Sequence, residues 1–299
     1  MATNAPVLPK DKFRELRDYL KKVGFKFEER PHQVFLARAE GLTVSLYESG
    51  KIVIGGKDRT LEREVRWYLS KLGAGGGEEL SEALKSATGK TRIGTDEVGK
   101  GDYFGPLVVA GALVDPATEK KLETLGVRDS KKLSVKRVAE LAPLIKMMLG
   151  DGRSEVLRID PRRYNGLYGE MGNLNRLLAW AHSRVIENLL GKNPDCAMAV
   201  VDEFSASSLS AALMEKGRSI HVLQSTRGER DIAVAAASVL ARYAFLARMD
   251  SMGHEFGAEF PRGASAVEEF AKRFVSEYGA EALGKVAKLH FATTKKVST

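Results

Sequence analysis

The chain has 299 residues, 43% of them hydrophobic and 29% charged, a composition typical of a soluble globular protein with one large domain or two of ordinary size. The apolar runs fall short of the ~20 residues that a membrane span needs and the first residues lack the apolar core of a secretory signal, so we expect a cytoplasmic protein without membrane association. The formal net charge of +8 favours a polyanionic partner but does not by itself select nucleic acid.

Residues 1–73 predict a small α+β domain. A helix is expected over residues 10–23, because apolar residues recur there at helical spacing, and a second one over residues 60–72. Between them lie four short alternating segments separated by good hairpin turns. The predicted strands are residues 24–29, 33–40, 42–48 and 51–56, which gives the order αββββα.

The two helices can cover only one face of this four-stranded sheet, so its second face is expected to be polar. The third strand alternates apolar with polar or aromatic residues, with Leu42, Val44 and Leu46 on one side and Thr43, Ser45 and Tyr47 on the other. Residues 1–73 contain 15 Lys and Arg against 10 Asp and Glu, a net +5 of the total +8. Two interpretations stay open: a solvated sheet face, or a platform for the phosphates and sugars of a nucleic acid.

Residues 74–90, AGGGEELSEALKSATGK, are typical of a linker, and residues 91–299 alternate strands and helices. Strands first and strand–helix alternation afterwards favour a mixed sheet flanked by helices. The single cysteine, Cys196, lies in an apolar run and is expected to be a buried thiol. The predicted strands are residues 92–98, 107–115, 155–160, 197–204 and 219–226, and the predicted helices are 136–149, 173–190, 231–250 and 266–278.

Acidic residues end two of these apparently buried strands. Asp96 and Glu97 follow RIGT, and Asp202 follows AMAVV. If the strands are neighbours, their carboxylates come together, and like charges so close call for a cation between them. With oxygen ligands and no His or Cys cluster, Mg²⁺ or Mn²⁺ is the natural ion. Taken singly, each acid could instead be an ordinary turn residue at a strand end.

A further acid is expected near the start of the alanine-rich helix, where the chain reads TRGERDIAVAAAS. Glu229 and Asp231 both lie there. Either could instead serve the helix alone, because acids in the first turn cap it and interact favourably with its dipole.

Four segments together resemble the type 2 ribonucleases H: DEVGKGDYFGPLVVAG from Asp96, DSKKL from Asp129, VVDEF from Val200, and AVAAASVLARYAF from Ala233. Within that family the chain looks like bacterial ribonuclease HIII. The glycine motif is Gly-Lys-Gly, where ribonuclease HII usually has Gly-Arg-Gly, and an extra domain precedes the catalytic one. In ribonuclease HIII that domain is similar to one half of the TATA-binding-protein fold.

The resemblance implies a ribonuclease H fold and an endonuclease that cleaves the RNA strand of RNA–DNA hybrids, leaving 5′-phosphate and 3′-hydroxyl ends. Asp96, Glu97 and Asp202 would be catalytic carboxylates that hold two Mg²⁺ or Mn²⁺ ions. Glu229 would be the fourth, because TRGE keeps the family's local context. The spacing from Glu229 to AAAS is one residue shorter than the family's, so Asp231 remains a competitor.

Substrate contacts are also implied by the resemblance. The backbone of Gly99, Lys100 and Gly101 would approach the ribose and test for its 2′-hydroxyl, which distinguishes RNA from DNA. The segment Ser130, Lys131 and Lys132 would lie along the substrate backbone, although two adjacent lysines are often simply solvated. We expect a monomer whose partner is the hybrid.

Other polar residues give weaker signals. His182 on the long helix is expected to be a packed or capping histidine first and a functional one second. Lys288 and His290 near the C-terminus could touch nucleic acid but are expected to lie in solvent. Two rival functions stay open: cleavage at single ribonucleotides in DNA, as in ribonuclease HII, and hybrid binding without catalysis. The second would require a replaced acid, whereas Asp96, Glu97 and Asp202 are all present.

Overall fold

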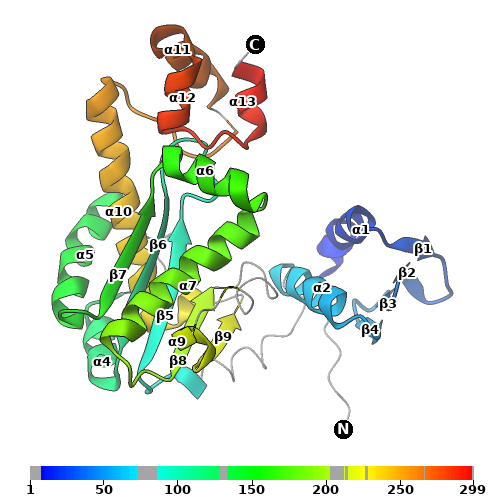
Figure 1. Cartoon of the computed structure of the whole chain (residues 1–299). Helices are drawn as coiled ribbons and strands as arrows, with labels where there is room; N and C mark the ends of the chain where they lie inside the picture. Colours follow the sequence, from blue (N-terminus) through cyan, green and yellow to red (C-terminus); the bar gives the residue numbers. More distant parts are fainter. Residues whose placement is uncertain are drawn as a thin grey trace. The chain divides into compact units, whose positions relative to one another are not determined.

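The computed structural model describes residues 8–72, 86–127, 133–202, 212, 215–225, 228–265 and 267–297. The described chain forms two compact units, the first ending at Ser86 and the second beginning at Ala87 (Figure 1). This boundary falls within the predicted linker 74–90, of which residues 74–85 lie outside the described residues.

The first unit is an antiparallel four-stranded sheet with the order β1-β2-β3-β4, accompanied by two helices. The predicted order αββββα is therefore confirmed. Its elements are η1 (Lys10–Lys12), α1 (Phe13–Lys22), β1 (Lys26–Glu28), β2 (Gln33–Ala39), β3 (Leu42–Tyr47), β4 (Ile52–Gly56) and α2 (Arg59–Lys71).

The helices of this unit pack against one face of its sheet. Leu16 and Leu20 of α1 and Val65 and Leu69 of α2 share a hydrophobic cluster with inward residues of the strands. In β3 the predicted alternation holds, since Leu42, Val44 and Leu46 are buried whereas Thr43, Ser45 and Tyr47 are partly exposed. The second sheet face is accordingly the polar one, as the period of two requires.

The second unit is built on a mixed five-stranded sheet with the order β7-β6-β5-β8-β9. Strands β7, β6 and β5 pair antiparallel, and β5, β8 and β9 pair parallel. The strands are β5 (Arg92–Val98), β6 (Leu107–Val114), β7 (Ser154–Ile159), β8 (Met198–Asp202) and β9 (His221–Ser225). The predicted mixed sheet is confirmed.

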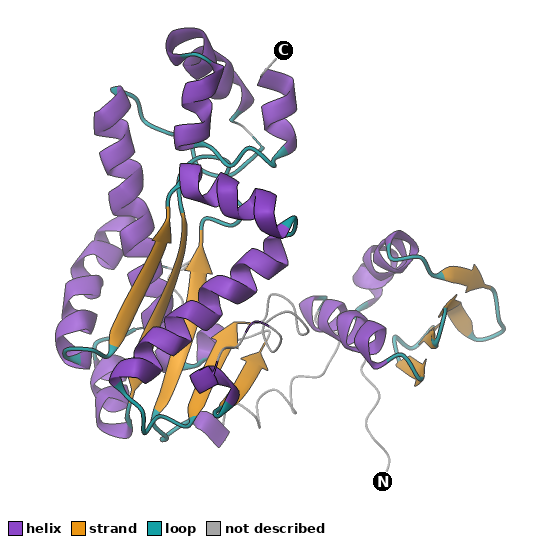
Figure 2. Ribbon diagram, viewed as in Figure 1, coloured by secondary structure: helices purple, strands orange, loops and turns teal. Residues whose placement is uncertain are grey.

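Helices cover both faces of this sheet (Figures 1 and 2). Helices α5 and α10 contribute to the hydrophobic cluster on one face, and α6 and α7 to the cluster on the other. The helical elements are α4 (Pro116–Thr124), α5 (Val135–Leu149), α6 (Pro161–Met171), α7 (Leu174–Lys192), α9 (Glu215–Arg218), η3 (Gly228–Arg230), α10 (Ile232–Phe256), α11 (Glu268–Tyr278), α12 (Ala280–Val286) and α13 (Ala292–Val297).

Glycines in the central strands let α10 and α7 approach the sheet closely. A Cβ on Gly94 would lie 2.2 Å from the backbone of Ala233 in α10, and one on Gly111 would lie 2.5 Å from Cγ1 of Val185 in α7. The alanines of α10 serve the same purpose on the helix side, because small side chains allow the axis to lie near the strands. Helix α10 therefore runs directly beneath β5, the strand that carries Asp96 and Glu97.

One described helix, α10, is long and apolar enough to cross a membrane by length and composition, although its sequence contains no uninterrupted apolar run of that length. Its most apolar stretch is 67% buried inside the second unit. Such burial identifies α10 as the central core helix of this unit.

Candidate active site

Asp96 lies near the carboxyl end of β5, on the face that α10 covers. Gly94, two residues earlier and therefore on the same face, contacts the backbone of α10. Asp96 is only 6% exposed, and its Oδ1 accepts a hydrogen bond of 2.8 Å from the backbone N–H of Glu97. The site thus begins with a nearly buried carboxylate held on a rigid strand.

Asp202 ends β8, the parallel neighbour of β5. The register pairs Ile93 with Ala199, Gly94 with Val200 and Thr95 with Val201. One further step brings the backbone of Asp202 beside that of Asp96, at the spacing of adjacent strands of about 4.8 Å. The expectation that these two acidic strand ends are neighbours is confirmed, while the side chain of Asp202 lies outside the description.

Glu97 lies on the opposite face of β5, the face covered by α7, and its side chain is 3% exposed. Its Oε2 lies 3.1 Å from Nε2 of His182, and the Lys100 ammonium donates to its Oε1. Burial opposes the charged form of Glu97, but the hydrogen bonds from His182 and Lys100 and the positive charge of Lys100 outweigh it and lower the pKa of Glu97 to about 2. Glu97 is therefore ionised at neutral pH.

His182 connects Glu97 to the core of α7. The ring is fully buried, with Nδ1 2.8 Å from Oγ1 of Thr95. A carboxylate only accepts hydrogen bonds, so Nε2 carries the proton toward Glu97 and Nδ1 accepts from the Thr95 hydroxyl. The expectation that His182 is a packed histidine is confirmed. His182 also orients Glu97, a candidate catalytic residue, and the sequence did not indicate this contact.

The glycine motif forms a tight turn after β5. Gly99 has φ +90°, and a Cβ there would lie 2.2 Å from the carbonyl oxygen of Pro106, so only glycine fits. A Cβ on Gly101 would meet nothing within 4 Å, which leaves its backbone open to solvent. The side chain of Lys100 is 46% exposed. Gly99 is thus required by the fold, whereas Gly101 leaves room for a ligand.

A C-terminal segment supports the loop that follows this motif. The Gly105 N–H donates to the carbonyl of Val286, the Lys288 N–H donates to that of Tyr103, and Phe104 pairs with Ala287. The Lys288 ammonium donates to the carbonyls of Asp102 and Gly105 at 2.8 and 2.7 Å. Residues 286–288 therefore hold the backbone of residues 102–105 in place.

The prediction that Lys288 lies in solvent is wrong, because Lys288 is fully buried and bound to backbone carbonyls. Burial lowers the pKa of Lys288 to about 7, although the charge of Asp102 opposes this. Its neighbour His290 is half-buried and stacks on Tyr168 with ring centroids 4.2 Å apart. Neither Lys288 nor His290 is therefore a solvent-exposed basic residue at the end of the chain.

Asp231 belongs to a buried ion-pair network. Its Oδ1 accepts from the N–H groups of Ala233 and Val234, which caps α10, and its Oδ2 accepts from Nε of Arg92 at 2.7 Å. Arg92 also binds Glu119, at 2.6 Å. The capping role considered for Asp231 is therefore observed.

Glu229 lies in η3, and this short helix packs against β8, the strand that ends at Asp202. Its side chain is outside the description, so its assignment as the fourth carboxylate stays a prediction. The same holds for the proposed substrate contacts of Ser130, Lys131 and Lys132, since residues 128–132 lie outside the described residues.

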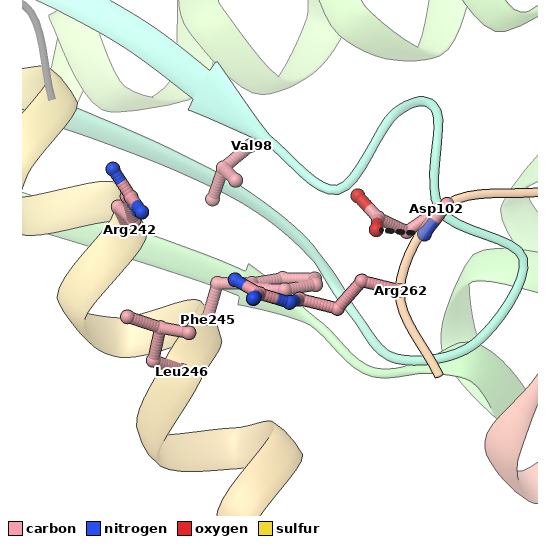
Figure 3. A pocket seen from close by; sticks show the side chains of 7 residues that line it. Val98, Asp102, Arg242, Phe245, Leu246 and Arg262 are labelled. Carbon is pink, nitrogen blue, oxygen red and sulfur yellow. Dashed lines mark hydrogen bonds between the residues drawn. The ribbon is translucent and has the colours of Figure 1, made fainter. Parts of the chain in front are cut away.

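A hollow of about 450 Å³ opens beside the glycine loop (Figure 3). Val98 and Asp102 line it from the end of β5 and the loop, and Arg242 and Phe245 line it from α10. Arg262 lies on the segment that follows α10, and its side chain extends into the hollow in Figure 3. Arg242 lies within the segment AVAAASVLARYAF that resembles the family, whereas no motif included Arg262.

The family model of ribonuclease HII matches residues 93–294, which include the four candidate carboxylates and the glycine motif. The chain belongs to the ribonuclease HII family. Among its curated relatives, ribonuclease HIII of Chlamydia pneumoniae is 37% identical and aligns over 94% of this chain and 93% of its own length. Ribonuclease HIII of Protochlamydia amoebophila is 36% identical over 92% of this chain and 89% of its own length.

Solved structures of ribonucleases HIII share the architecture. The structure of Bst-RNase HIII in complex with Mn²⁺ matches with a TM-score of 0.66 and 30% identity, and the match covers 99% of this chain and 98% of that protein. RNase H3 of Aquifex aeolicus matches with a TM-score of 0.57 and 28% identity over 95% of this chain and 98% of its own. The predicted ribonuclease H-like fold preceded by a small α+β unit is confirmed.

Proposed function

We propose that this member of the ribonuclease HII family is a metal-dependent endonuclease that hydrolyses the RNA strand of RNA–DNA hybrids and leaves 5′-phosphate and 3′-hydroxyl ends. The observation that supports the proposal is the register of β5 and β8, in which the paired residues Thr95 and Val201 directly precede Asp96 and Asp202, beside an open glycine loop. Neighbouring carboxylates of like charge need a cation, and an all-oxygen donor set suits a hard divalent ion.

Asp96, Glu97, Asp202 and Glu229 would hold Mg²⁺ or Mn²⁺, and two ions fit four carboxylates. When bound, such ions activate the attacking water and neutralise the charge that develops on the leaving oxygen. The protein supplies the geometry: β5 fixes Asp96, while His182 and Lys100 keep Glu97 ionised and oriented. All four proposed donors are carboxylates, the oxygen ligands that Mg²⁺ and Mn²⁺ prefer.

The glycine loop would select RNA. The open backbone at Gly101 allows a ribose to approach, so that a backbone group can hydrogen-bond to a 2′-hydroxyl. The support from residues 286–288 keeps this loop in one position. A fixed loop also keeps the ribose in place for the reaction, because a misplacement of about 1 Å can cost about 100-fold in rate.

The polar face of the β1–β4 sheet would hold the hybrid while the second unit cuts it. The protein would act as a monomer in the cytoplasm. Lys131 and Lys132 would contribute phosphate contacts beside the site.

The carboxylate pair is tested by replacing Asp202 with asparagine. Asp202→Asn keeps the shape of the side chain but removes a charge from the metal site, so the cleavage rate in Mg²⁺ should fall at least about 100-fold. Hybrid affinity should persist. Asp195→Asn, an exposed acid before the opposite end of β8, is the matched control and should cleave normally.

The assay compares a labelled all-RNA strand paired with DNA against a DNA duplex with one embedded ribonucleotide. We expect the hybrid to be cleaved at many positions and the single ribonucleotide poorly. Cleavage of the second substrate alone would favour the ribonuclease HII-like alternative, and near wild-type activity of Asp202→Asn would refute the metal site.

A further inference from the structure

Both oxygens of the Glu97 carboxylate have donors within the protein. Nε2 of His182 lies 3.1 Å from Oε2, and the ammonium of Lys100 donates to Oε1. The Glu97 side chain is 3% exposed, so its charge is almost removed from water and is stabilised by these partners. A metal ion that binds Glu97 therefore meets a carboxylate whose two oxygens are already engaged.

One of the two donors, His182, is held firmly by the core. Its ring is fully buried, and Oγ1 of Thr95 lies 2.8 Å from its other ring nitrogen, Nδ1. Thr95 and Glu97 are two residues apart on β5, so their side chains lie on the same face of the strand and the ring bridges them. Because both ring nitrogens are engaged in a buried position, His182 is expected to stay on Oε2.

The other donor, Lys100, can move more easily. Its side chain is 46% exposed, and it lies three residues after Glu97 in the turn that follows β5. A lysine ammonium is a point charge on a flexible stem, without the fixed geometry of a guanidinium fork. Its chain neighbours Gly99 and Gly101 have no side chains that could pack against this stem. Oε1 is therefore the oxygen at which an incoming cation can exchange with a protein donor.

An ammonium and a divalent ion disfavour each other at one carboxylate oxygen. An ammonium nitrogen lies about 2.7–2.9 Å from a carboxylate oxygen, and Mg²⁺ lies about 2.0–2.1 Å from its oxygen ligands. Two cations at such distances from one oxygen repel each other strongly where little water screens them. An ion that takes the place of the ammonium, in contrast, keeps the buried carboxylate paired. Exchange at Oε1 is thus favoured over sharing.

We propose that the Lys100 ammonium is the counter-ion of Glu97 in the metal-free protein and that a divalent metal ion displaces it from Oε1, while His182 stays on Oε2. The ion pair stabilises a buried carboxylate before the metal arrives. It also weakens metal binding, because the ion has to break it, so Lys100 sets the concentration of divalent ion at which the site fills. The proposal rests on the proposed function, since it takes Glu97 as a metal ligand.

The first test measures metal affinity by calorimetry, on the full chain and without nucleic acid. Lys100→Met keeps the length of the side chain but removes its charge. If the ammonium occupies Oε1 for about nine tenths of the time, its removal should tighten the binding of Mg²⁺ and Mn²⁺ about tenfold. Lys100→Arg keeps a cation within reach of Glu97, so its affinity should stay within about threefold of the wild type.

The matched control is Lys192→Met. Lys192 lies 2.9 Å from Oε2 of Glu155 and its side chain is 51% exposed, so its ion pair resembles that of Lys100 in chemistry and in exposure of the lysine. It lies ten residues from His182 along α7, which corresponds to about 15 Å. Lys192→Met should bind metal like the wild type. This control separates the loss of a competitor at Glu97 from a change in net charge.

The displacement itself is measured in the wild-type protein, by the rate at which Lys100 is acetylated. Trace labelling followed by mass spectrometry gives this rate for individual lysines, with and without saturating Mg²⁺. An ammonium that has left a carboxylate and lies near a divalent cation loses its proton more readily, so Lys100 should react several-fold faster with Mg²⁺. Lys192 should react at the same rate in both conditions. This measurement does not depend on the folding of a variant.

An affinity of Lys100→Met for Mg²⁺ equal to or weaker than that of the wild type would overturn the proposal. So would a labelling rate of Lys100 that Mg²⁺ leaves unchanged. If Glu97→Gln binds the ions as tightly as the wild type, Glu97 is not a metal ligand, and the metal site and the exchange are both wrong. Failure of the nuclease alone looks different: Mg²⁺ would displace Lys100 in a chain that never cuts the hybrid.

Discussion

The carboxylate of Asp231 is used twice within the fold. One oxygen caps α10, and the other binds Arg92, whose guanidinium is also held by Glu119. Burial raises the pKa of Asp231 although Arg92 opposes this, as expected for an acid removed from water. Asp231 thus has a structural role in capping α10 and binding Arg92, and whether Asp231 or Glu229 supplies the fourth carboxylate is left to experiment.

Exchanging each acid for its amide separates the two roles. Asp231→Asn keeps a capping oxygen but removes the charge facing Arg92, so the free energy of unfolding should fall by about 1–3 kcal/mol while kcat changes little. Glu229→Gln should lower kcat by orders of magnitude with little change in melting temperature. Thermal melts measure the stability of both variants, and single-turnover cleavage measures their rates. If Asp231→Asn loses the rate and Glu229→Gln keeps it, Asp231 is the metal ligand.

The acids could be predicted from the sequence because each signal is local. Asp96 and Asp202 end apolar runs, and a charge at the end of a buried strand is conspicuous without knowledge of its neighbours. His182 and Lys288 gave no such signal. Their burial depends on Thr95 and Glu97 in one case and on the carbonyls of Asp102 and Gly105 in the other, partners that are distant along the chain.

At the scale of elements, two helices that begin alike were not predicted. Helix α4 starts after Asp115-Pro116 and α6 after Asp160-Pro161, an acid at the N-cap followed by proline in the first turn. This is a recognised start signal for helices, and the Asp115 carboxylate accepts from the N–H of Thr118 at 2.7 Å. Both aspartates were instead assigned to the ends of the preceding strands. These two helices could therefore have been predicted.

The end of α10, in contrast, could not have been predicted from local sequence. The predicted helix ended at residue 250, whereas α10 continues to Phe256 and ends at Gly257 in the left-handed conformation. Met252 is buried in the core, and Phe256 packs on Phe260, Phe274 and Tyr278. The last turns are thus stabilised by packing against the C-terminal helical region, which local periodicity does not reveal.

Lys288, which donates to the carbonyls of Asp102 and Gly105, makes the free energy of unfolding depend on pH. Its pKa is lowered from 10.5 to about 7 by burial, so between these values the unfolded chain binds the proton and the native protein does not. The free energy of unfolding should therefore rise with pH from about 7 to 10.5 through this residue. The groups around Lys288 are Asp102, Tyr164 and His290; the pKa of Tyr164 is raised and that of His290 lowered, so both titrate outside the window.

Lys288→Met should remove that slope and also lower the free energy of unfolding by about 1–3 kcal/mol, because two buried carbonyls lose their donor. Denaturant unfolding of both proteins between pH 7 and 9 measures the difference. Lys285→Met, an exposed lysine on α12, is the control and should keep the wild-type slope. Identical slopes for the wild type and Lys288→Met would show that Lys288 does not release a proton on folding.

At the scale of the whole molecule, the chain combines a small basic unit with a larger one that contains the candidate site. The second unit has its own two hydrophobic clusters, one on each face of the β5–β9 sheet, so it does not depend on the first for a core. Residues 1–73 supply +5 of the net +8 and a polar sheet face with partly exposed Thr43, Ser45 and Tyr47. This distribution suits a unit that binds a polyanion and a unit that cuts it.

Deletion of residues 1–73 tests that division of labour. The truncated protein should bind the hybrid much more weakly, and its affinity should depend less steeply on salt, because each lost phosphate contact reduces the slope of log K against log [salt] by about 0.7–0.9. At saturating hybrid its kcat should stay close to that of the full chain, which serves as the control for an intact catalytic unit. Titrations at several salt concentrations, with and without residues 1–73, give both slopes. If affinity and slope are the same in the two proteins, the β1–β4 sheet does not hold the hybrid, and its polar face is an ordinary solvated surface.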